Sequence, residues 1–240
     1  MTCPIFADYH THTVYSHGKG TVEENILAAI ECGLSTIAIA DHGPGQLAHG
    51  VKLSKIRAQI EEIARLREKY KHKIQVLSSI EADITGLDGT LDLPDSWQDD
   101  FDLVLGGYHR TAIPRKKSDL FRLQIPGLIV PGKVSRNMTS AVVHAIEDGR
   151  LFMVTHPGEY IPVDMQQVSR AAAEHDVYIE INNKHPMAQA DLKIAAAQGA
   201  KFLLSSDAHH PKNVGRVDRA LDAAMQAGIE KSRIVNLKKE

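Results

Sequence analysis

The 240-residue sequence predicts a parallel α/β fold of barrel size. Apolar segments of strand length alternate with helical patterns throughout the chain, which is typical of repeated strand–helix units and not of a β-sandwich. The length suits a single domain spanning residues 1–240, because α/β barrels of this size occur undivided. Histidines and carboxylates also follow several of the predicted strands. In a parallel barrel these strand ends open on one face, where active sites are built.

Seven apolar segments are expected to form the strands. They cover residues 5–9, 36–40, 74–80, 102–107, 151–155, 177–181 and 201–205.

The first predicted helix has a clear start and a clear end. Thr21 and Glu24 fit a capping box, apolar residues follow at helical spacing, and Gly33 stops the pattern. The second helix covers about residues 53–66, with its charges on the side opposite to the apolar face. Helical periodicity also predicts helices near residues 138–146 and at 164–175, 187–198 and 213–226.

Two connections depart from the strand–helix pattern. Residues 84–91 predict a small hairpin that turns at Asp88-Gly89, so the third unit is expected to lack a full crossover helix. A long loop is expected between His109 and Lys133, and long loops are often functional. Its basic residues are Arg110, Arg115, Lys116, Lys117 and Arg122.

The composition disfavours several classes of partner. A net charge of −2 creates no field that attracts nucleic acid or an anionic membrane. No segment approaches the roughly 18 apolar residues of a spanning helix, and the N-terminus lacks the pattern of a signal peptide. The two cysteines, Cys3 and Cys32, are too few for a disulfide framework. We therefore expect a cytoplasmic protein, whose oligomeric state the sequence leaves undetermined.

The segment Asp8-Tyr9-His10-Thr11-His12 has the pattern of a metal site. Alternate side chains of an extended strand share a face, so Asp8, His10 and His12 are expected to point the same way. Imidazole is the commonest side-chain metal ligand. The same spacing recurs far downstream in Asp207-Ala208-His209. Asp8 and Asp41 are expected either to orient histidine rings or to make structural hydrogen bonds.

Similar residues follow most of the predicted strands and are expected to converge on one face of the barrel. The candidate metal ligands are His10, His12, His17, His42, Glu81, His109, His156, Asp207 and His209. A single zinc ion with an open position takes only about three protein ligands, so this set indicates two or three ions. The remaining histidines are weaker candidates: His72, His144 and His175 suit packing or solvent, whereas His49, His185 and His210 lie near strand ends and could line the pocket.

These motifs resemble those of the PHP family, named for polymerase and histidinol phosphatase, and in particular its stand-alone bacterial phosphoesterases. The resemblance spans residues 7–210 and rests on His10-Thr-His12, Asp41-His42-Gly43-Pro44, Ile80-Glu81-Ala82, His109, His156-Pro157-Gly158, Glu180-Ile181-Asn182-Asn183 and Ser206-Asp207-Ala208-His209. It implies a distorted seven-stranded (β/α) TIM-like barrel with three divalent metal ions, usually zinc and sometimes manganese or iron. It also implies one ion on His10, His12, Glu81 and Asp207, a second on Glu81, His109 and His156, and a third on His17, His42 and His209.

The expected function is hydrolysis of a small phosphate monoester by a metal-dependent phosphoesterase. A cluster of divalent cations lowers the pKa of bound water and neutralises phosphoryl charge, so a metal-bound hydroxide near Glu81 is the expected nucleophile. Glu81, Asp207 and His209 are therefore candidate catalytic residues. Arg110 is a further candidate, because a guanidinium can donate two parallel hydrogen bonds to phosphate.

Four alternatives remain open. The resemblance also permits a 3′–5′ exonuclease or nucleotide phosphodiesterase, although the sequence has no broad basic track with interleaved aromatic residues. It permits a histidinol-phosphate phosphatase as well. An amidohydrolase-type reaction is disfavoured, because three ions exceed what carbonyl activation requires. A metal-bound module without turnover would be expected to show degenerate ligands, and every motif position is present.

Overall fold

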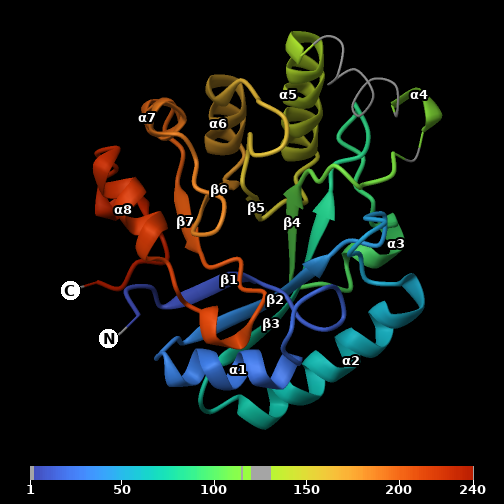
Figure 1. The fold of residues 1–240 in the computed structure, drawn as a ribbon, viewed down its shortest axis with the longest axis vertical. Coiled ribbons are helices and arrows are strands. Elements are labelled where there is room, and N and C mark those ends of the chain that lie inside the picture. The colour runs from blue at the N-terminus through green and yellow to red at the C-terminus, as the bar shows by residue number, and fades with distance from the viewer. Residues whose placement is uncertain (1–2, 115, 120–130, 240) are drawn as a thin grey trace.

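The computed structural model describes residues 3–114, 116–119 and 131–239. Within these residues, seven strands form one sheet in the order of the sequence, and each strand pairs in parallel with the next (Figure 1). They are β1 (Ala7–Thr11), β2 (Thr36–His42), β3 (Gln75–Asp83), β4 (Leu103–Gly107), β5 (Met153–Val154), β6 (Tyr178–Asn182) and β7 (Phe202–Ser205). All seven predicted strands are thus present.

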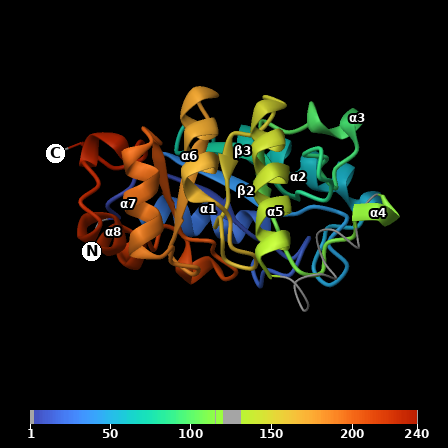
Figure 2. The ribbon, with the colours of Figure 1, turned by 90° about the horizontal axis from the view of Figure 1, so that it is seen from above.

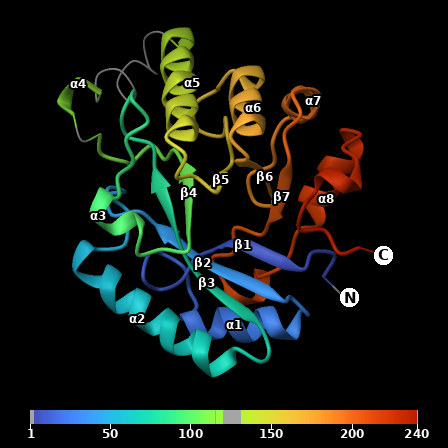
Figure 3. The same ribbon diagram turned by 180° about the vertical axis from the view of Figure 1, so that it is seen from behind.

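The first and last strands approach each other and nearly close the sheet into a barrel. Thr11 and Ala208 form a parallel bridge, and the His12 amide donates a hydrogen bond of 2.8 Å to the Ala208 carbonyl. The two ends of the described chain lie side by side next to this junction (Figures 1 and 3). Ile5 and Leu237 form an antiparallel bridge there. The predicted seven-stranded TIM-like barrel is confirmed.

The longer helices cover the outside of the sheet. α1 (Val22–Glu31) and α2 (Leu53–Tyr70) lie beside β1–β3, while α5 (Pro131–Glu147), α6 (Met165–Glu174), α7 (Gln189–Ala197) and α8 (Asp218–Gln226) follow one another along the remaining strands (Figures 1 and 2). No helix of the described residues combines the length and the apolar character that crossing a membrane requires.

The capping box predicted for the first helix is present. The Thr21 hydroxyl accepts a hydrogen bond from the Glu24 amide, and the Glu24 carboxylate accepts one from the Thr21 amide. The two bonds satisfy donors that the first turn of a helix otherwise leaves unpaired.

The irregular third connection also has the expected form. Ile84 and Leu91 form an antiparallel bridge, and Gly89 adopts the positive φ of 81° that the turn requires. A single four-residue helix, α3 (Asp95–Gln98), follows the hairpin before β4, so no full crossover helix is present in this described segment.

The predicted loop between His109 and Lys133 is shorter than expected. It contains α4 (Lys117–Asp119), and α5 already begins at Pro131. Arg115 and Arg122 lie outside the described residues.

The last predicted helix starts five residues later than expected, at Asp218. Residues Pro211–Asn213 form a separate 3₁₀ turn, η3, and Gly215 with a φ of 74° interrupts the helical path. A second 3₁₀ turn, η4 (Lys231–Arg233), follows α8.

The barrel interior has two layers. Ala40, Leu105, Met153 and Leu203 form a buried apolar cluster. Because strand side chains alternate, the residues two positions further along point into the same interior. These positions carry the next layer: His42 on β2, Gly107 at the end of β4, Thr155 after β5 and Ser205 on β7. The carboxyl ends of the strands therefore place polar groups on an apolar floor.

Candidate metal centre

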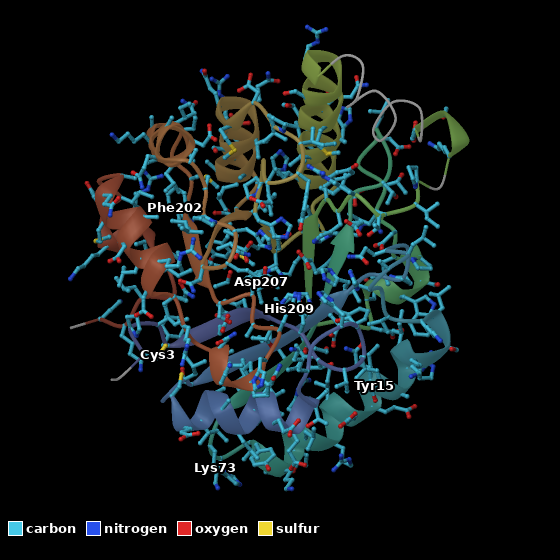
Figure 4. All side chains as sticks on the ribbon, viewed as in Figure 1. Cys3, Tyr15, Lys73, Phe202, Asp207 and His209 are labelled. Atoms are coloured by element: carbon cyan, nitrogen blue, oxygen red, sulfur yellow. The ribbon has the colours of Figure 1, made fainter. Side chains whose placement is uncertain are left out.

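The polar layer brings together the nine predicted metal ligands. His10 lies in β1, His42 ends β2, and Glu81 lies in β3; His12 and His17 follow β1, His109 follows β4, His156 follows β5, and Asp207 and His209 follow β7. All are buried except His17 and His209, which are partly buried. Figure 4 shows Asp207 and His209 near the centre of the molecule, above β1 and β2.

Glu81 occupies the middle of this group. Its Oε2 lies 2.9 Å from His42 Nδ1 and 3.2 Å from His10 Nε2. Its Oε1 lies 2.9 Å from His156 Nε2 and 3.8 Å from His109 Nε2. His12 Nε2 lies 3.7 Å from Oε2 as well. Each oxygen therefore faces a different group of imidazoles, which is the arrangement expected of a carboxylate that bridges two cations.

A second part of the centre surrounds Asp207. Its Oδ1 lies 3.2 Å from His12 Nε2 and 3.2 Å from His209 Nδ1. The ring centroid of His209 lies 4.2 Å from the ring centroid of His12 and 4.2 Å from that of His17. His17 also stacks on His42 at 4.9 Å, which connects this part to the Glu81 group.

Three overlapping sets of residues each place their donor atoms within 4.8 Å of one another. They are His10, His12 and Asp207; His12, His42 and His209; and His42, Glu81 and His109. The first set contains three of the four ligands that the family resemblance implies for the first ion, Glu81 being the fourth. His42 belongs to two sets: one shares His209 with the implied third group, and the other shares Glu81 and His109 with the implied second group.

Several of these donors are buried without a hydrogen-bond partner. They are His12 Nδ1, His17 Nδ1, His42 Nδ1, Glu81 Oε2 and Asp207 Oδ1. Unpaired buried polar atoms are costly, and bound cations would give a partner to donors of this kind. Imidazole nitrogens and carboxylate oxygens are also the donors that zinc and similar cations use. The residues present therefore fit a cluster of divalent metal ions.

The protonation of these groups suits metal binding. Burial and neighbouring imidazoles lower the pKa of His12 well below its usual range and that of His17 to about 3, so their rings stay neutral. Burial acts to raise the pKa of Glu81, but His10, His109 and His42 hold it well below its usual range. Burial acts to lower the pKa of His109, but the carboxylates of Glu81 and Asp83 raise this pKa to about 9. The site thus combines ionised Glu81 with neutral rings at His12 and His17, whereas His109 would have to release a proton before its ring could bind a cation.

Two further carboxylates hold the ligand rings, and the sequence did not single them out. Asp83 Oδ1 lies 2.9 Å from His109 Nδ1 and accepts a hydrogen bond from the His109 amide. Glu180 Oε1 lies 2.7 Å from His10 Nδ1, and its Oε2 accepts a bond from the His156 amide. Such contacts fix the orientation of a metal-binding imidazole. Alternation could have indicated both, because Asp83 follows Glu81 by two residues and Glu180 interrupts an apolar strand.

Asp8 and Asp41 do not orient histidine rings, so that expectation was wrong. Asp41 accepts hydrogen bonds from Thr13, Ser16 and Gln59 of α2, because it precedes His42 and faces the opposite side of β2. Asp8 accepts bonds from the amides of Ser206 and Gly215. The pairing register of β1 shifts between Asp8 and Thr11, so Asp8 does not join His10 at the metal centre. Asp8 and Asp41 instead make structural hydrogen bonds, which was the second expectation for these two residues.

The backbone at the centre is unusual in two ways. His156 and Asp207 adopt positive φ angles of 28° and 48° without being glycines, a conformation that concentrates at functional sites. Gly107 leaves room for the Glu81 carboxylate, because a Cβ there would overlap Thr155 Oγ1 and lie 3.3 Å from Glu81 Oε1. Thr155 Oγ1 donates a hydrogen bond of 2.9 Å to Glu81 Oε1.

A cavity of about 260 Å³ opens above the centre. Beyond the ligands, its lining residues are Gln46, His49, Arg110, Thr111, Tyr160, Lys184 and His185. The Arg110 guanidinium lies 5.9 Å from the ring centroid of Tyr160. His49 and His185 thus line the pocket. The other weaker candidates lie elsewhere: the His210 side chain caps η3, and the His144 ring donates a hydrogen bond to the Leu87 carbonyl. His72 and His175 are exposed.

Comparisons with known proteins agree with this geometry. Residues 8–184 match the family model described as the PHP domain. A protein of Thermoanaerobacter sp. (strain X514) named "Probable phosphatase" is 30% identical over 245 residues, which cover 97% of this chain and 90% of that protein. One of Vibrio parahaemolyticus with the same description is 30% identical over 243 residues, covering 96% and 89%.

A solved structure shows the same fold. It is the histidinol phosphate phosphatase of Lactococcus lactis subsp. lactis Il1403, solved with zinc, L-histidinol and phosphate, and its TM-score is 0.62 at 16% identity. The alignment covers 93% of this chain and 94% of that one. Since the family model covers most of the chain and the sequence relatives span nearly all of it, the chain belongs to the PHP family.

Proposed function

We propose that this protein, a metal-dependent phosphoesterase, hydrolyses a small phosphate monoester at a cluster of three divalent metal ions. The observation that carries the proposal is the position of Glu81, whose two oxygens face different groups of imidazoles. The nine donor residues, His10, His12, His17, His42, Glu81, His109, His156, Asp207 and His209, would hold the ions. Such ions lower the pKa of bound water toward 7 and offset the charge of a phosphoryl group.

The other residues of the site would position the ligands and the substrate. Asp83 and Glu180 hold the rings of His109 and His10, and Thr155 holds one oxygen of Glu81. Arg110 lies at the cavity with its guanidinium over Tyr160, where it can donate two hydrogen bonds to phosphate. Positioning of this kind supplies much of the rate enhancement of phosphoryl transfer.

The cavity favours a small ester over a nucleic acid. Its volume of about 260 Å³ is below the usual range for drug-sized ligands. Tyr160 is the one Phe, Tyr or Trp side chain among the described lining residues, whereas single-strand binding usually uses several stacking aromatics. We therefore place the exonuclease and phosphodiesterase alternatives second.

Zinc is the metal that we propose, with manganese or iron as alternatives. Seven imidazoles with two carboxylates form a borderline donor set, which suits zinc best. The Lactococcus lactis protein with the same fold was solved with zinc. We also place the protein in the cytoplasm, on the basis of its two free cysteines.

The test is a substrate panel on metal-loaded protein. We expect p-nitrophenyl phosphate and small phosphate monoesters to be hydrolysed, bis-p-nitrophenyl phosphate to react much more slowly, and chelation to abolish both activities. Re-addition of zinc should restore the monoesterase activity. Hydrolysis of the diester at a higher kcat/KM than any monoester would contradict the proposal, as would full activity after the metal has been removed.

A further inference from the structure

The rim of the cavity is strongly biased toward positive charge. Arg110 and Lys184 both line it, and Asp207 is the sole carboxylate among the described lining residues. Asp207 belongs to the candidate metal centre, so it is not available to pair with a substrate cation. Glu159 lies just outside this lining, and its Oε1 is 3.1 Å from His185 Nδ1. A positively charged leaving group would therefore meet two cations and no free carboxylate of this lining.

Asn182 holds the backbone of the turn that carries Lys184, and it also contacts Asp207. The Asn182 side-chain oxygen accepts hydrogen bonds from the amides of Lys184 and His185, at 2.8 and 2.9 Å. The Asn182 Nδ2 atom lies 3.2 Å from Asp207 Oδ2. The turn that carries Lys184 is thereby fixed to the metal centre through a single buried side chain.

The ammonium group of Lys184 lies at the edge of the donor set. It is 3.3 and 3.4 Å from the two ring nitrogens of His209 and 3.9 Å from Asp207 Oδ1. The Lys184 side chain is 46% exposed, so its attraction to Asp207 is weakened by solvent. Once Asp207 and His209 use their lone pairs for a metal ion, the ammonium loses these partners and is available to an anion bound in the cavity.

We propose that Lys184 binds an acidic group on the alcohol portion of the substrate. The inference rests on the proposed function and narrows its substrate class to phosphate esters whose leaving group carries a carboxylate or a second phosphate. Arg110 would contact the phosphoryl group that is transferred, while Lys184 would select the second anion. The Tyr160 ring lies 5.9 Å from the Arg110 guanidinium and 6.2 Å from the ring of His185, the neighbour of Lys184 in the chain.

Binding of phosphonates tests this without any turnover, because their carbon–phosphorus bond does not hydrolyse as an ester does. Methylphosphonate, phosphonoacetate and 2-aminoethylphosphonate carry a neutral, an acidic and a basic substituent. We expect metal-loaded protein to bind phosphonoacetate roughly tenfold or more tightly than methylphosphonate, the effect of one charge-assisted hydrogen bond. It should bind 2-aminoethylphosphonate more weakly than methylphosphonate. Calorimetry gives all three dissociation constants.

Variants at position 184 assign the effect to this lysine. Lys184→Gln should reduce the preference for phosphonoacetate over methylphosphonate to about threefold or less, and Lys184→Glu should favour 2-aminoethylphosphonate. The matched control is Lys193→Gln, since Lys193 is an exposed lysine of α7 that does not line the cavity. The control should keep the wild-type preference. Metal content is measured for each variant and should equal that of the wild type.

Three results would overturn the proposal. They are equal binding of methylphosphonate and phosphonoacetate by the wild type, an unchanged preference in Lys184→Gln, and a lower metal content in that variant that accounts for its weaker binding. The second result would mean that the metal ions bind the carboxylate. The proposed function fails separately: protein that binds phosphonates with the expected preference but hydrolyses no phosphate monoester would refute the hydrolysis and leave the selection by Lys184 intact.

Discussion

The carboxylate of Glu81 is the residue on which the centre depends most. Five imidazoles approach its two oxygens within 3.8 Å. Glu81→Gln removes the negative charge that two cations would share, so we expect kcat to fall by several orders of magnitude while the far-UV circular dichroism stays unchanged. Glu174→Gln is the control, because Glu174 is an exposed residue at the end of α6. A folded Glu81→Gln protein with near-normal kcat would rule out the bridging role.

Gly107 provides a second test at the same carboxylate. A methyl group at this position overlaps Thr155 Oγ1, so Gly107→Ala should displace Thr155 and break its hydrogen bond to Glu81. We expect at least a tenfold loss of kcat/KM with the metal still bound. Thr155→Val removes the same hydrogen bond without adding a methyl group at position 107 and should reproduce part of the loss. Wild-type kcat/KM in both variants would show that this contact does not matter for catalysis.

Arg110 is expected to contact the phosphoryl group. Arg110→Ala should cost about 1.5 to 3 kcal/mol, the scale of a charge-assisted hydrogen bond, or about 10- to 150-fold in kcat/KM. Arg110→Lys should rescue poorly, because an ammonium keeps the charge but loses the paired donors. Lys116→Ala is the control, since its ammonium pairs with Asp88 2.6 Å away. Wild-type kcat/KM in Arg110→Ala, or a loss that follows metal loss, would contradict this role.

The sequence indicated the candidate ligands but not the residues that orient them. His42, His109 and His156 were recognisable because each follows an apolar strand. Asp83 and Glu180 also occupy strand positions, yet nothing in the chain order shows that they reach His109 and His10. The Asp83 contact joins the ends of the neighbouring strands β3 and β4. The Glu180 contact depends on the curvature of the sheet, which brings β6 near β1 across the barrel interior.

At the scale of elements, the capping box of α1 is a local feature that sequence alone predicts correctly. Thr21→Ala removes the hydroxyl that accepts the Glu24 amide, so we expect the free energy of unfolding to fall by about 1 kcal/mol. Urea denaturation measures this change, and kcat/KM should stay at the wild-type value because the cap is exposed and does not line the cavity. Ser54→Ala in the first turn of α2 is the control. Equal stability of Thr21→Ala and wild type would show that the cap contributes little.

Strand ends were less predictable than strand positions. The apolar run of β2 ends at Ala40, but the strand continues through Asp41 and His42, because His42 pairs with Glu81 on β3. β1 likewise continues to Thr11, where it meets Ala208. Parallel pairing with the neighbouring strand extends each strand into its polar end. The hydrophobic pattern of the sequence does not predict this extension, because it contains no information on pairing. The same extension places the ligands at fixed positions of the sheet.

At the scale of the whole molecule, the metal centre joins parts of the chain that are distant in sequence. The first candidate ligand, His10, lies in β1 and the last, His209, follows β7, and the approach of these two strands nearly closes the barrel. Glu81 connects them from the middle of the sheet through its contact with His10. Metal ions bound here would therefore stabilise the closed barrel as well as the site.

Removal of the metal should accordingly lower thermal stability together with activity. Nine donor residues, one of them bridging, supply about ten ligand positions, which suits about three ions with places left for water and substrate. Elemental analysis of purified protein should therefore find about three ions per chain. A ligand that binds only the folded state at about 100 times its dissociation constant adds about 2.7 kcal/mol, so chelation should lower Tm by several degrees.

The variants separate the contribution of the ions from that of their ligands. Metal-free Glu81→Gln should melt somewhat below the metal-free wild type, because the Glu81 carboxylate still contacts the imidazoles of His10, His42 and His156 without ions. Re-addition of zinc should raise the Tm of the wild type more than that of the variant. One ion or fewer in fully active protein would refute the three-ion cluster. A Tm that is unaffected by chelation would show that barrel closure at β1 and β7 does not depend on metal.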